Sequence, residues 1–294
     1  MNRTRAVSAS EGMMAPVGEQ DWRQRLAQAV ADGVACTGPA GALEALRDEI
    51  ERLIGPAEPS PLEVRVPVLG VDACKGGWVG VLLSPARPAA VLAAATIAAL
   101  VELARESADL AVVAIDIPIG LPDDRVREAD TLARRALPGK GSSVFTTLTR
   151  SAYEAPTYAE AREANLVATG GTQSASAQAY ALRARILDVD GWLRSRPAVE
   201  VIEVHPELAF ARMTGTPVRQ PKSAPEGITA RRAALGGVGL VPPAWFRGSG
   251  FAEDDLLDAC AAAWTAVRHS RGESESFPDE PELFSDGIPA AIRV

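Results

Sequence analysis

Four aspartates of this sequence stand where predicted buried strands end or where a predicted helix begins. Asp72 ends one apolar run and Asp116 ends another. Asp255 and Asp258 lie three residues apart near the start of a predicted helix, so they share one face of that helix. A charge beside a buried strand is costly unless it is compensated. The placement therefore predicts that these carboxylates bind a cation or take part in catalysis.

Several of these aspartates also have a purely structural interpretation. Asp72 could cap the glycine turn that follows it through local backbone hydrogen bonds. Asp254 and Asp255 could be present because the helix dipole favours acidic residues in a first turn. Asp258 lies one turn further in, where the dipole explains it less well. Its spacing from Asp255 favours a pair of carboxylates that clamp a cation.

A third strand end is predicted around Pro206. An apolar strand is expected over residues 199–205, and Pro206 suits the first position of the helix that follows. Glu203 and Glu207 flank this turn, and either could complete the acidic site. His205 could assist proton transfer to a leaving group. The alternative interpretation is that His205 and Glu207 only start the helix.

The loop at residues 138–145 carries backbone and hydroxyl donors that could contact a phosphate, among them Ser142 and Ser143. It lacks the GxxxxGK[ST] spacing of a P-loop, so a substrate loop and a plain linker are both open interpretations. Residues 125–235 hold 16 Lys and Arg against 11 Asp and Glu, although the whole chain carries a net charge of -8. The local excess keeps nucleic acid as a candidate partner.

The composition limits the kind of site that this chain can build. Two histidines and three widely separated cysteines fit neither a histidine-rich metal site nor a zinc knuckle. A metal would therefore be held by oxygen, and Mg²⁺ or Mn²⁺ is expected. No apolar run approaches the roughly 20 residues of a membrane span, and the N-terminus lacks the apolar centre of a secretory signal. We therefore expect a cytoplasmic protein without a membrane partner, and the sequence does not indicate its oligomeric state.

The elements that must position these residues fall into three parts. Residues 1–20 are predicted to be a disordered leader, and residues 21–61 two short amphipathic helices with a Gly- and Pro-rich linker. Residues 62–294 are predicted to form one α/β domain with a three-stranded meander, a crossover helix, two further strands and a C-terminal helix. A helical insertion is expected at about residues 123–197. This order predicts a mixed five-stranded sheet with flanking helices.

Five motifs occur in an order that resembles a known family. They are GVDACKGGW at residues 70–78, AIDIPIGLP at 114–122, SSVF at 142–145, EVHPE at 203–207 and DDLLDA at 254–259. Together they resemble a predicted nuclease family of the RNase H-like superfamily that is catalogued as domain of unknown function 429. The resemblance extends from about residue 62 to the C-terminus, and the first 60 residues match nothing recognised.

This resemblance implies an RNase H-like fold and divalent-metal-dependent hydrolysis of phosphodiesters. The carried-over site consists of Asp72, Asp116, Asp255 and Asp258 as metal ligands and catalytic residues, with Glu203 or Glu207 nearby. Such carboxylates suit two Mg²⁺ or Mn²⁺ ions about 4 Å apart. Glu207 is counted among the catalytic residues, and the residues expected to contact substrate are Lys75, Ser142, Ser143, Arg150 and Lys222.

Two other functions fit parts of the same sequence. A phosphotransferase or ATPase of the actin and sugar-kinase type also begins with Gly-x-Asp followed by glycines, but it needs a second Gly-rich phosphate loop that the segment after Asp116 does not supply. A catalytically silent interaction module would keep the RNase H-like fold and bind no metal. Cleavage assays with added metal distinguish these functions.

Overall fold

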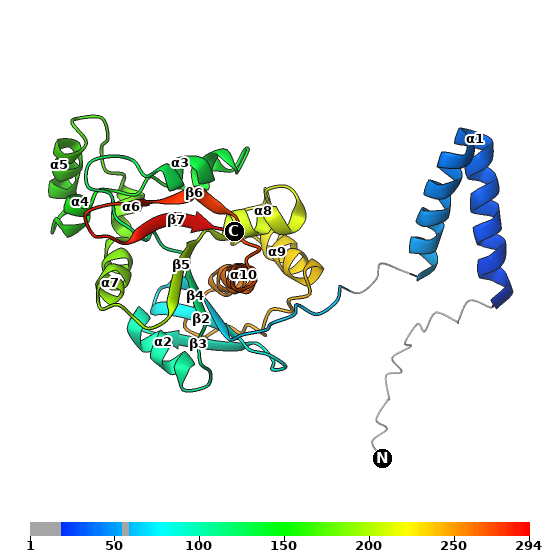
Figure 1. Cartoon of the computed structure of the whole chain (residues 1–294), viewed down its shortest axis with the longest axis horizontal. Coiled ribbons are helices and arrows are strands. Elements are labelled where there is room, and N and C mark those ends of the chain that lie inside the picture. The colour runs from blue at the N-terminus through cyan, green and yellow to red at the C-terminus, as the bar shows by residue number, and fades with distance from the viewer. Residues whose placement is uncertain (1–18, 55–58) are drawn as a thin grey trace, which may run out of the picture. The chain divides into compact units, whose positions relative to one another are not determined.

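A computed structural model describes residues 19–54 and 59–294, and the chain divides into two compact units, residues 1–58 and 59–294 (Figure 1). In the first unit, α1 (Glu19–Ile54) is two helical arms joined at Gly38, whose φ of 74° lies in the left-handed region that favours glycine. The predicted leader lies outside the described residues except for its last two, which begin α1, and residues 55–58 of the predicted linker are also outside them.

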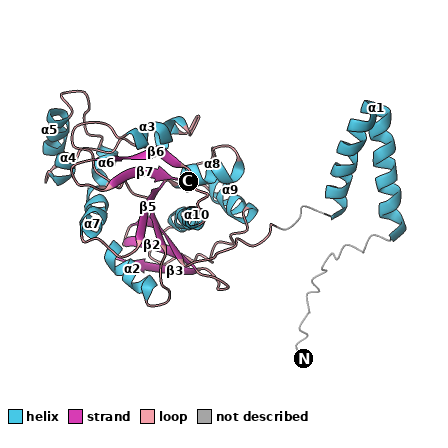
Figure 2. Ribbon diagram, viewed as in Figure 1, coloured by secondary structure: helices cyan, strands magenta, loops and turns pink. Residues whose placement is uncertain are grey.

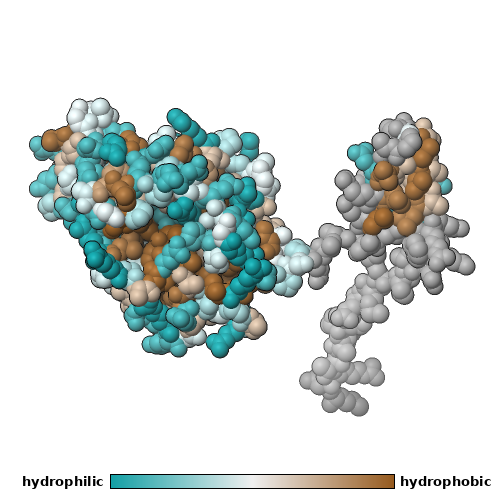
Figure 3. Space-filling view, viewed as in Figure 1, coloured by the Kyte–Doolittle hydropathy of each residue, from teal (hydrophilic) through white to brown (hydrophobic). Residues whose placement is uncertain are grey.

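The two arms of α1 are joined by an ion pair between Arg25 and Glu49, whose Nε and Oε1 atoms are 2.7 Å apart. Hydrophobic residues gather along part of this hairpin in the space-filling view (Figure 3), and Val34 and Leu43 are among the exposed ones. In the described part of the chain, no helix is both apolar and long enough to cross a membrane.

The second unit is built on one mixed sheet in the order β3-β2-β1-β4-β5-β7-β6 (Figure 2). The first three strands form an antiparallel meander. The pairs β1–β4, β4–β5 and β5–β7 are parallel. The pairing of β6 with β7 is antiparallel. The strands are β1 (Val68–Cys74), β2 (Gly77–Leu83), β3 (Ala90–Ala94), β4 (Val112–Ile115), β5 (Glu200–Val204), β6 (Ser276–Leu283) and β7 (Pro289–Arg293).

The predicted number of five strands is wrong, because the C-terminal segment adds two. The segment after α10 (Glu253–Ser270) contains charged residues and prolines, so its hydrophobic pattern did not indicate a strand. In the structure, β7 completes a parallel pair with β5, in which Glu203 is opposite Ile292. The structure confirms the predicted mixed sheet with flanking helices. The RNase H-like fold stays a prediction.

Helices cover both faces of the sheet (Figures 1 and 2). On one face, α10 packs on β1, β2 and β4, and α8 and α9 pack against α10. On the other face, α2 packs on β2 and β3 and also contacts α7. The helix α3 packs on β6 and β7, and its buried Ala129 and Ala133 belong to the same hydrophobic cluster as the core residues of α10. The helices of this unit are α2 (Ile97–Arg105), α3 (Glu128–Arg135), α4 (Arg150–Glu154), α5 (Tyr158–Ala168), α6 (Ala177–Ala181), α7 (Arg183–Arg194), α8 (Pro206–Thr214), α9 (Pro225–Gly237) and α10 (Glu253–Ser270), with a 3₁₀ turn η1 (Gly141–Ser143).

Close contact between β1 and α10 depends on Gly70. A Cβ atom at this position would lie 2.0 Å from the backbone nitrogen of Ala263 and 2.3 Å from the carbonyl oxygen of Ala259. Small residues at 259–263 of α10 let the helix backbone approach the strand this closely. Because Asp72 follows Gly70 by two residues and Asp258 precedes Ala259, the same contact sets the position of two predicted site residues.

Candidate acidic cleft

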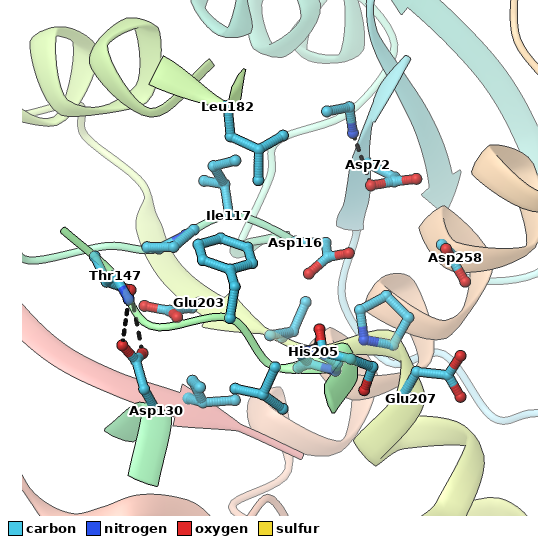
Figure 4. A pocket seen from close by; sticks show the side chains of 18 of the residues that line it. Asp72, Asp116, Ile117, Asp130, Thr147, Leu182, Glu203, His205, Glu207 and Asp258 are labelled. Carbon is cyan, nitrogen blue, oxygen red and sulfur yellow. Dashed lines mark hydrogen bonds between the residues drawn. The ribbon is translucent and has the colours of Figure 1, made fainter. Parts of the chain in front are cut away.

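A cleft of about 370 Å³ lies where β1, β4 and β5 end and α8 begins (Figure 4). Its position at the carboxyl ends of parallel strands is the usual place for a ligand in an open α/β sheet. Segments from distant parts of the sequence line it, and the side chains that matter below are Asp72, Asp116, Ile117, Arg127, Asp130, Ser143, Phe145, Thr147, Gln178, Leu182, Glu203, His205, Glu207, Lys222 and Asp258.

Asp72 and Asp116 occupy equivalent positions on neighbouring parallel strands. Val71 is opposite Ile115 in the register, and the Asp116 amide donates a hydrogen bond to the Val71 carbonyl oxygen at 3.0 Å. Residues at equivalent positions of parallel strands point to the same face of the sheet. Asp72 and Asp116 therefore share the face on which α10 packs, and both line the cleft (Figure 4).

Asp258 reaches the same cleft from α10. It is 4% exposed and lies in the second turn of the helix, next to the residues that pack against Gly70. Its Oδ2 atom accepts a hydrogen bond from Lys222 Nζ at 2.8 Å. In the described part of the chain, Asp72 and Asp116 have no cationic side chain in direct contact. The structure thus gathers three carboxylates from three elements, with one lysine among them.

The three carboxylates are held in an unfavourable electrostatic environment. Burial, together with repulsion from Asp116 and Asp258, raises the pKa of Asp72 well above its usual value. Burial raises the pKa of Asp116 to about 7 and that of Asp258 to about 6, while the Lys222 ammonium opposes both increases. Such raised values are typical of sites where a protein keeps charges together for binding or chemistry.

Glu203 has a structural partner that the sequence did not reveal. Arg127 donates to both of its carboxylate oxygens at 2.8 Å, and the Ile119 amide donates to Oε2 at 2.7 Å. Arg127 also binds Asp130 at 2.6 Å, and Asp130 accepts a hydrogen bond from the Thr147 amide. This buried network fixes one wall of the cleft. The signal for it was Asp130 itself, a charged residue on the buried face of α3 between Ala129 and Ala133.

Glu207 and His205 line the cleft at the start of α8. Pro206 is the first residue of α8, and His205 occupies the N-cap position without a capping hydrogen bond from its side chain. Glu207 Oε1 accepts a hydrogen bond from the buried Arg231 at 2.5 Å. His205 Nε2 lies 3.4 Å from the Ser143 carbonyl oxygen, and Nδ1 is a buried atom without a hydrogen-bond partner in the described part of the chain. Burial lowers the pKa of His205, so the imidazole is neutral at pH 7.

Four predicted site residues do not line the cleft. Asp255 instead caps α10, where its Oδ2 atom accepts a hydrogen bond from the Ala252 amide at 2.9 Å. Lys75 is exposed at the turn between β1 and β2, and Ser142 is exposed on η1. Arg150 binds Asp190 at 2.9 Å and Asp286 at 2.7 Å, so it connects α7 to the C-terminal segment. Ser143 and Lys222 do line the cleft.

One side of the cleft is apolar. Phe145 and Leu182 are half-buried there, beside the buried Ile117, and the exposed Gln178 adds an amide to the same wall. In Figure 4, Leu182 and Ile117 lie on the opposite side of Asp116 from His205 and Glu207. This wall could not be predicted from the sequence, because Phe145 is more than thirty residues from Gln178 and Leu182 and lines the same cleft only in the folded chain.

The donor atoms of the cleft fit a hard divalent cation, since Asp72, Asp116 and Asp258 offer only oxygen. In residues 19–54 and 59–294, no three Asp, Glu, His or Cys side chains lie close enough together to hold one ion. Mg²⁺ commonly takes one or two carboxylates and completes its shell with water and substrate phosphate. Two strand-end carboxylates would therefore suffice as protein ligands.

The fold and the site define a mixed α/β protein with an acidic cleft at the carboxyl edge of its parallel strands. The chain belongs to the family described as Protein of unknown function (DUF429), which matches residues 70–283. Searches among curated proteins and among solved structures found no match. The family matches the one that the sequence motifs resemble, whereas the nuclease activity and the RNase H-like fold implied by that resemblance stay predictions.

Proposed function

We propose that this protein is a divalent-cation-dependent phosphodiesterase that acts on nucleic acid in the acidic cleft. The observation that carries the proposal is the convergence of Asp72, Asp116 and Asp258 with raised pKa values. Burying three carboxylates together disfavours folding, because each lowers the stability of the charged form of the others. A bound cation would relieve this repulsion, and Mg²⁺ or Mn²⁺ suits oxygen ligands.

In the proposed reaction, water attacks phosphorus, one P–O ester bond breaks, and the products are a phosphomonoester and an alcohol. A bound divalent cation would polarise the phosphoryl group and lower the pKa of water. His205 is positioned at the cleft to accept the proton of the attacking water. The sequence suggested that His205 protonates the leaving group, but a neutral imidazole is better suited to accept a proton.

The apolar wall supports a substrate that carries an unpaired base. Aromatic side chains stack on bases with about 1–3 kcal/mol per base, and Phe145 with Leu182 offers such a surface beside the carboxylates. A cleft of about 370 Å³ suits a group of nucleotide size rather than a duplex. We therefore expect Phe145→Ala to weaken binding of single-stranded oligonucleotides about 5- to 150-fold, with less effect on abasic oligonucleotides.

The proposal is tested by cleavage of single-stranded, duplex, hybrid and branched nucleic acids with Mg²⁺, Mn²⁺ or EDTA. Cleavage should require the cation and be lost in Asp116→Asn, whereas Asp124→Asn, which changes an exposed carboxylate in the same way, should behave as the unmodified protein. Parallel melting curves should show that the cation raises the melting temperature. Absence of both cleavage and stabilisation by either cation would refute the proposal.

The same experiment separates the two alternative functions. A silent interaction module predicts no response to the cation in either assay. A phosphotransferase would need a glycine loop open to phosphate, but Gly120 is the glycine after Asp116, and a Cβ there would lie 2.7 Å from the Ala290 side chain. Gly120 thus packs against β7 and does not line the cleft, which disfavours the phosphotransferase.

A further inference from the structure

Lys222 lies among the carboxylates where a cation would be expected. Its Nζ atom is 2.8 Å from Asp258 Oδ2 and 4.0 Å from Asp254 Oδ2. Although burial lowers it, the pKa of Lys222 is raised above its usual value by Asp258, Asp72 and Asp116. The ammonium group therefore carries its charge throughout the neutral range and already neutralises one carboxylate of the cleft.

The backbone that carries Lys222 is held by a buried arginine. Arg231 is 0% exposed, and its Nη1 atom donates to the Gln220 and Gly227 carbonyl oxygens at 3.3 Å. Its Nη2 atom binds Glu207 across the cleft wall. A Cβ on Gly227 would lie 1.8 Å from the Pro221 carbonyl oxygen, so the loop packs tightly on the start of α9. Lys222 thus extends from a fixed backbone, although its side chain is 47% exposed.

The charges of the cleft leave room for one further divalent cation. Lys222 pairs with Asp258, and this leaves Asp72 and Asp116 as the carboxylates without a cation in direct contact in the described part of the chain. Two carboxylates balance one divalent ion, and one or two carboxylates are the usual protein share of a Mg²⁺ shell. A second ion beside Asp258 would have to displace the ammonium group.

We propose that Lys222 takes the place of a second metal ion, so that the cleft binds one divalent cation through Asp72 and Asp116 while the Lys222 ammonium contacts the phosphoryl oxygens. This inference rests on the proposed phosphodiesterase function and replaces the two-ion site that the sequence resemblance implies. An ammonium group is a compact point charge with three donors, which suits contact with phosphate oxygens.

The test is the number of Mn²⁺ ions that each chain binds, measured by isothermal titration calorimetry and by the electron paramagnetic resonance signal of free Mn²⁺. The unmodified protein and Lys222→Arg, which keeps the charge, should each bind one ion. Lys222→Met removes the charge and frees Asp258, so it should bind two. Lys75→Met makes the same chemical change at an exposed turn and should still bind one ion.

Two ions on the unmodified protein, or one ion on Lys222→Met, would overturn the role of Lys222 and leave the phosphodiesterase proposal standing. No bound ion on any of the four proteins would overturn the cation-dependent function itself, and the Lys222 proposal with it. The two failures are therefore distinguishable. Two ions on the unmodified protein would overturn the role of Lys222 even if Lys222→Met does not fold.

Discussion

Replacing Asp258 with Asn should stabilise the protein more at neutral pH than at acidic pH. The carboxylate is 4% exposed, and burial raises its pKa from 3.8 to about 6 even though Lys222 opposes the increase. Between these two values the folded protein keeps a proton that the unfolded chain has lost. The proton therefore stabilises the folded state fully below pH 3.8, and this stabilisation is lost as the pH rises through 6.

The size of the effect follows from the two pKa values. One pH unit corresponds to about 1.4 kcal/mol, so Asp258, compared with a side chain that does not ionise, destabilises the folded protein by about 3 kcal/mol at pH 7.5 and by about 1 kcal/mol at pH 4.5. Asn cannot ionise and has nearly the same size. The free energy of unfolding of Asp258→Asn, relative to the unmodified protein, should therefore rise by about 2 kcal/mol between pH 4.5 and pH 7.5.

Urea denaturation in EDTA at the two pH values measures this difference, followed by the fluorescence of Trp264, which lies on the same helix. Asp124→Asn provides the control, because it removes a carboxylate that is 65% exposed. A difference between Asp258→Asn and the unmodified protein that does not change with pH would show that Asp258 does not titrate as inferred. A larger loss of stability at pH 7.5 than at pH 4.5 would show that the carboxylate is a stabilising structural group.

Three further predictions concern residues that support the cleft. Gly70→Ala should lower the free energy of unfolding by about 3 kcal/mol, because the new Cβ would meet backbone atoms of α10. Gly80→Ala should lower it less, since that Cβ would meet only the side chains of leucines, and equal losses would contradict the reasoning. Arg127→Met should lower the free energy of unfolding by about 3–5 kcal/mol, because it leaves two buried carboxylates without their cation. Urea denaturation measures the two glycine variants and Arg127→Met. A free energy of unfolding that hardly changes in Arg127→Met would show that the ion pairs of Arg127 are dispensable. His205→Asn should reduce kcat on a single-stranded oligonucleotide about 100-fold while the Kd for Mn²⁺ stays unchanged, and an unchanged kcat would leave His205 as a residue that only precedes α8.

The sequence alone determined the parts of the site that depend on local pattern. Apolar runs that stop at a carboxylate marked Asp72 and Asp116, and a parallel pair of strands then requires these two residues to meet at one edge. Helical spacing placed Asp258 one turn into a long helix, and Pro206 marked the start of α8. These features could be predicted because each depends on residues that are neighbours along the chain.

The tertiary structure decided which charges face one another. Lys222 and Asp258 are 36 residues apart in sequence, and Arg127 and Glu203 are 76 apart, so no local pattern encodes either pair. Their contacts depend on how loops close over the sheet edge. For the same reason the sequence could not decide whether Glu203 is available to the acidic site. In the structure its carboxylate forms an ion pair with Arg127.

The number of strands and the N-terminus of α10 also show the difference between what local sequence predicts and what tertiary packing decides. The strand character of β7 is stabilised by its pairing with β5, which lies more than eighty residues earlier in the chain, and not by its own composition. Asp255 and Asp258 share a helix face in the sequence pattern, but Asp255 turns back to the Ala252 amide at the exposed N-terminus of α10. Local periodicity fixes which face of an element a residue occupies, whereas the packing of distant segments fixes which partner that residue finds there.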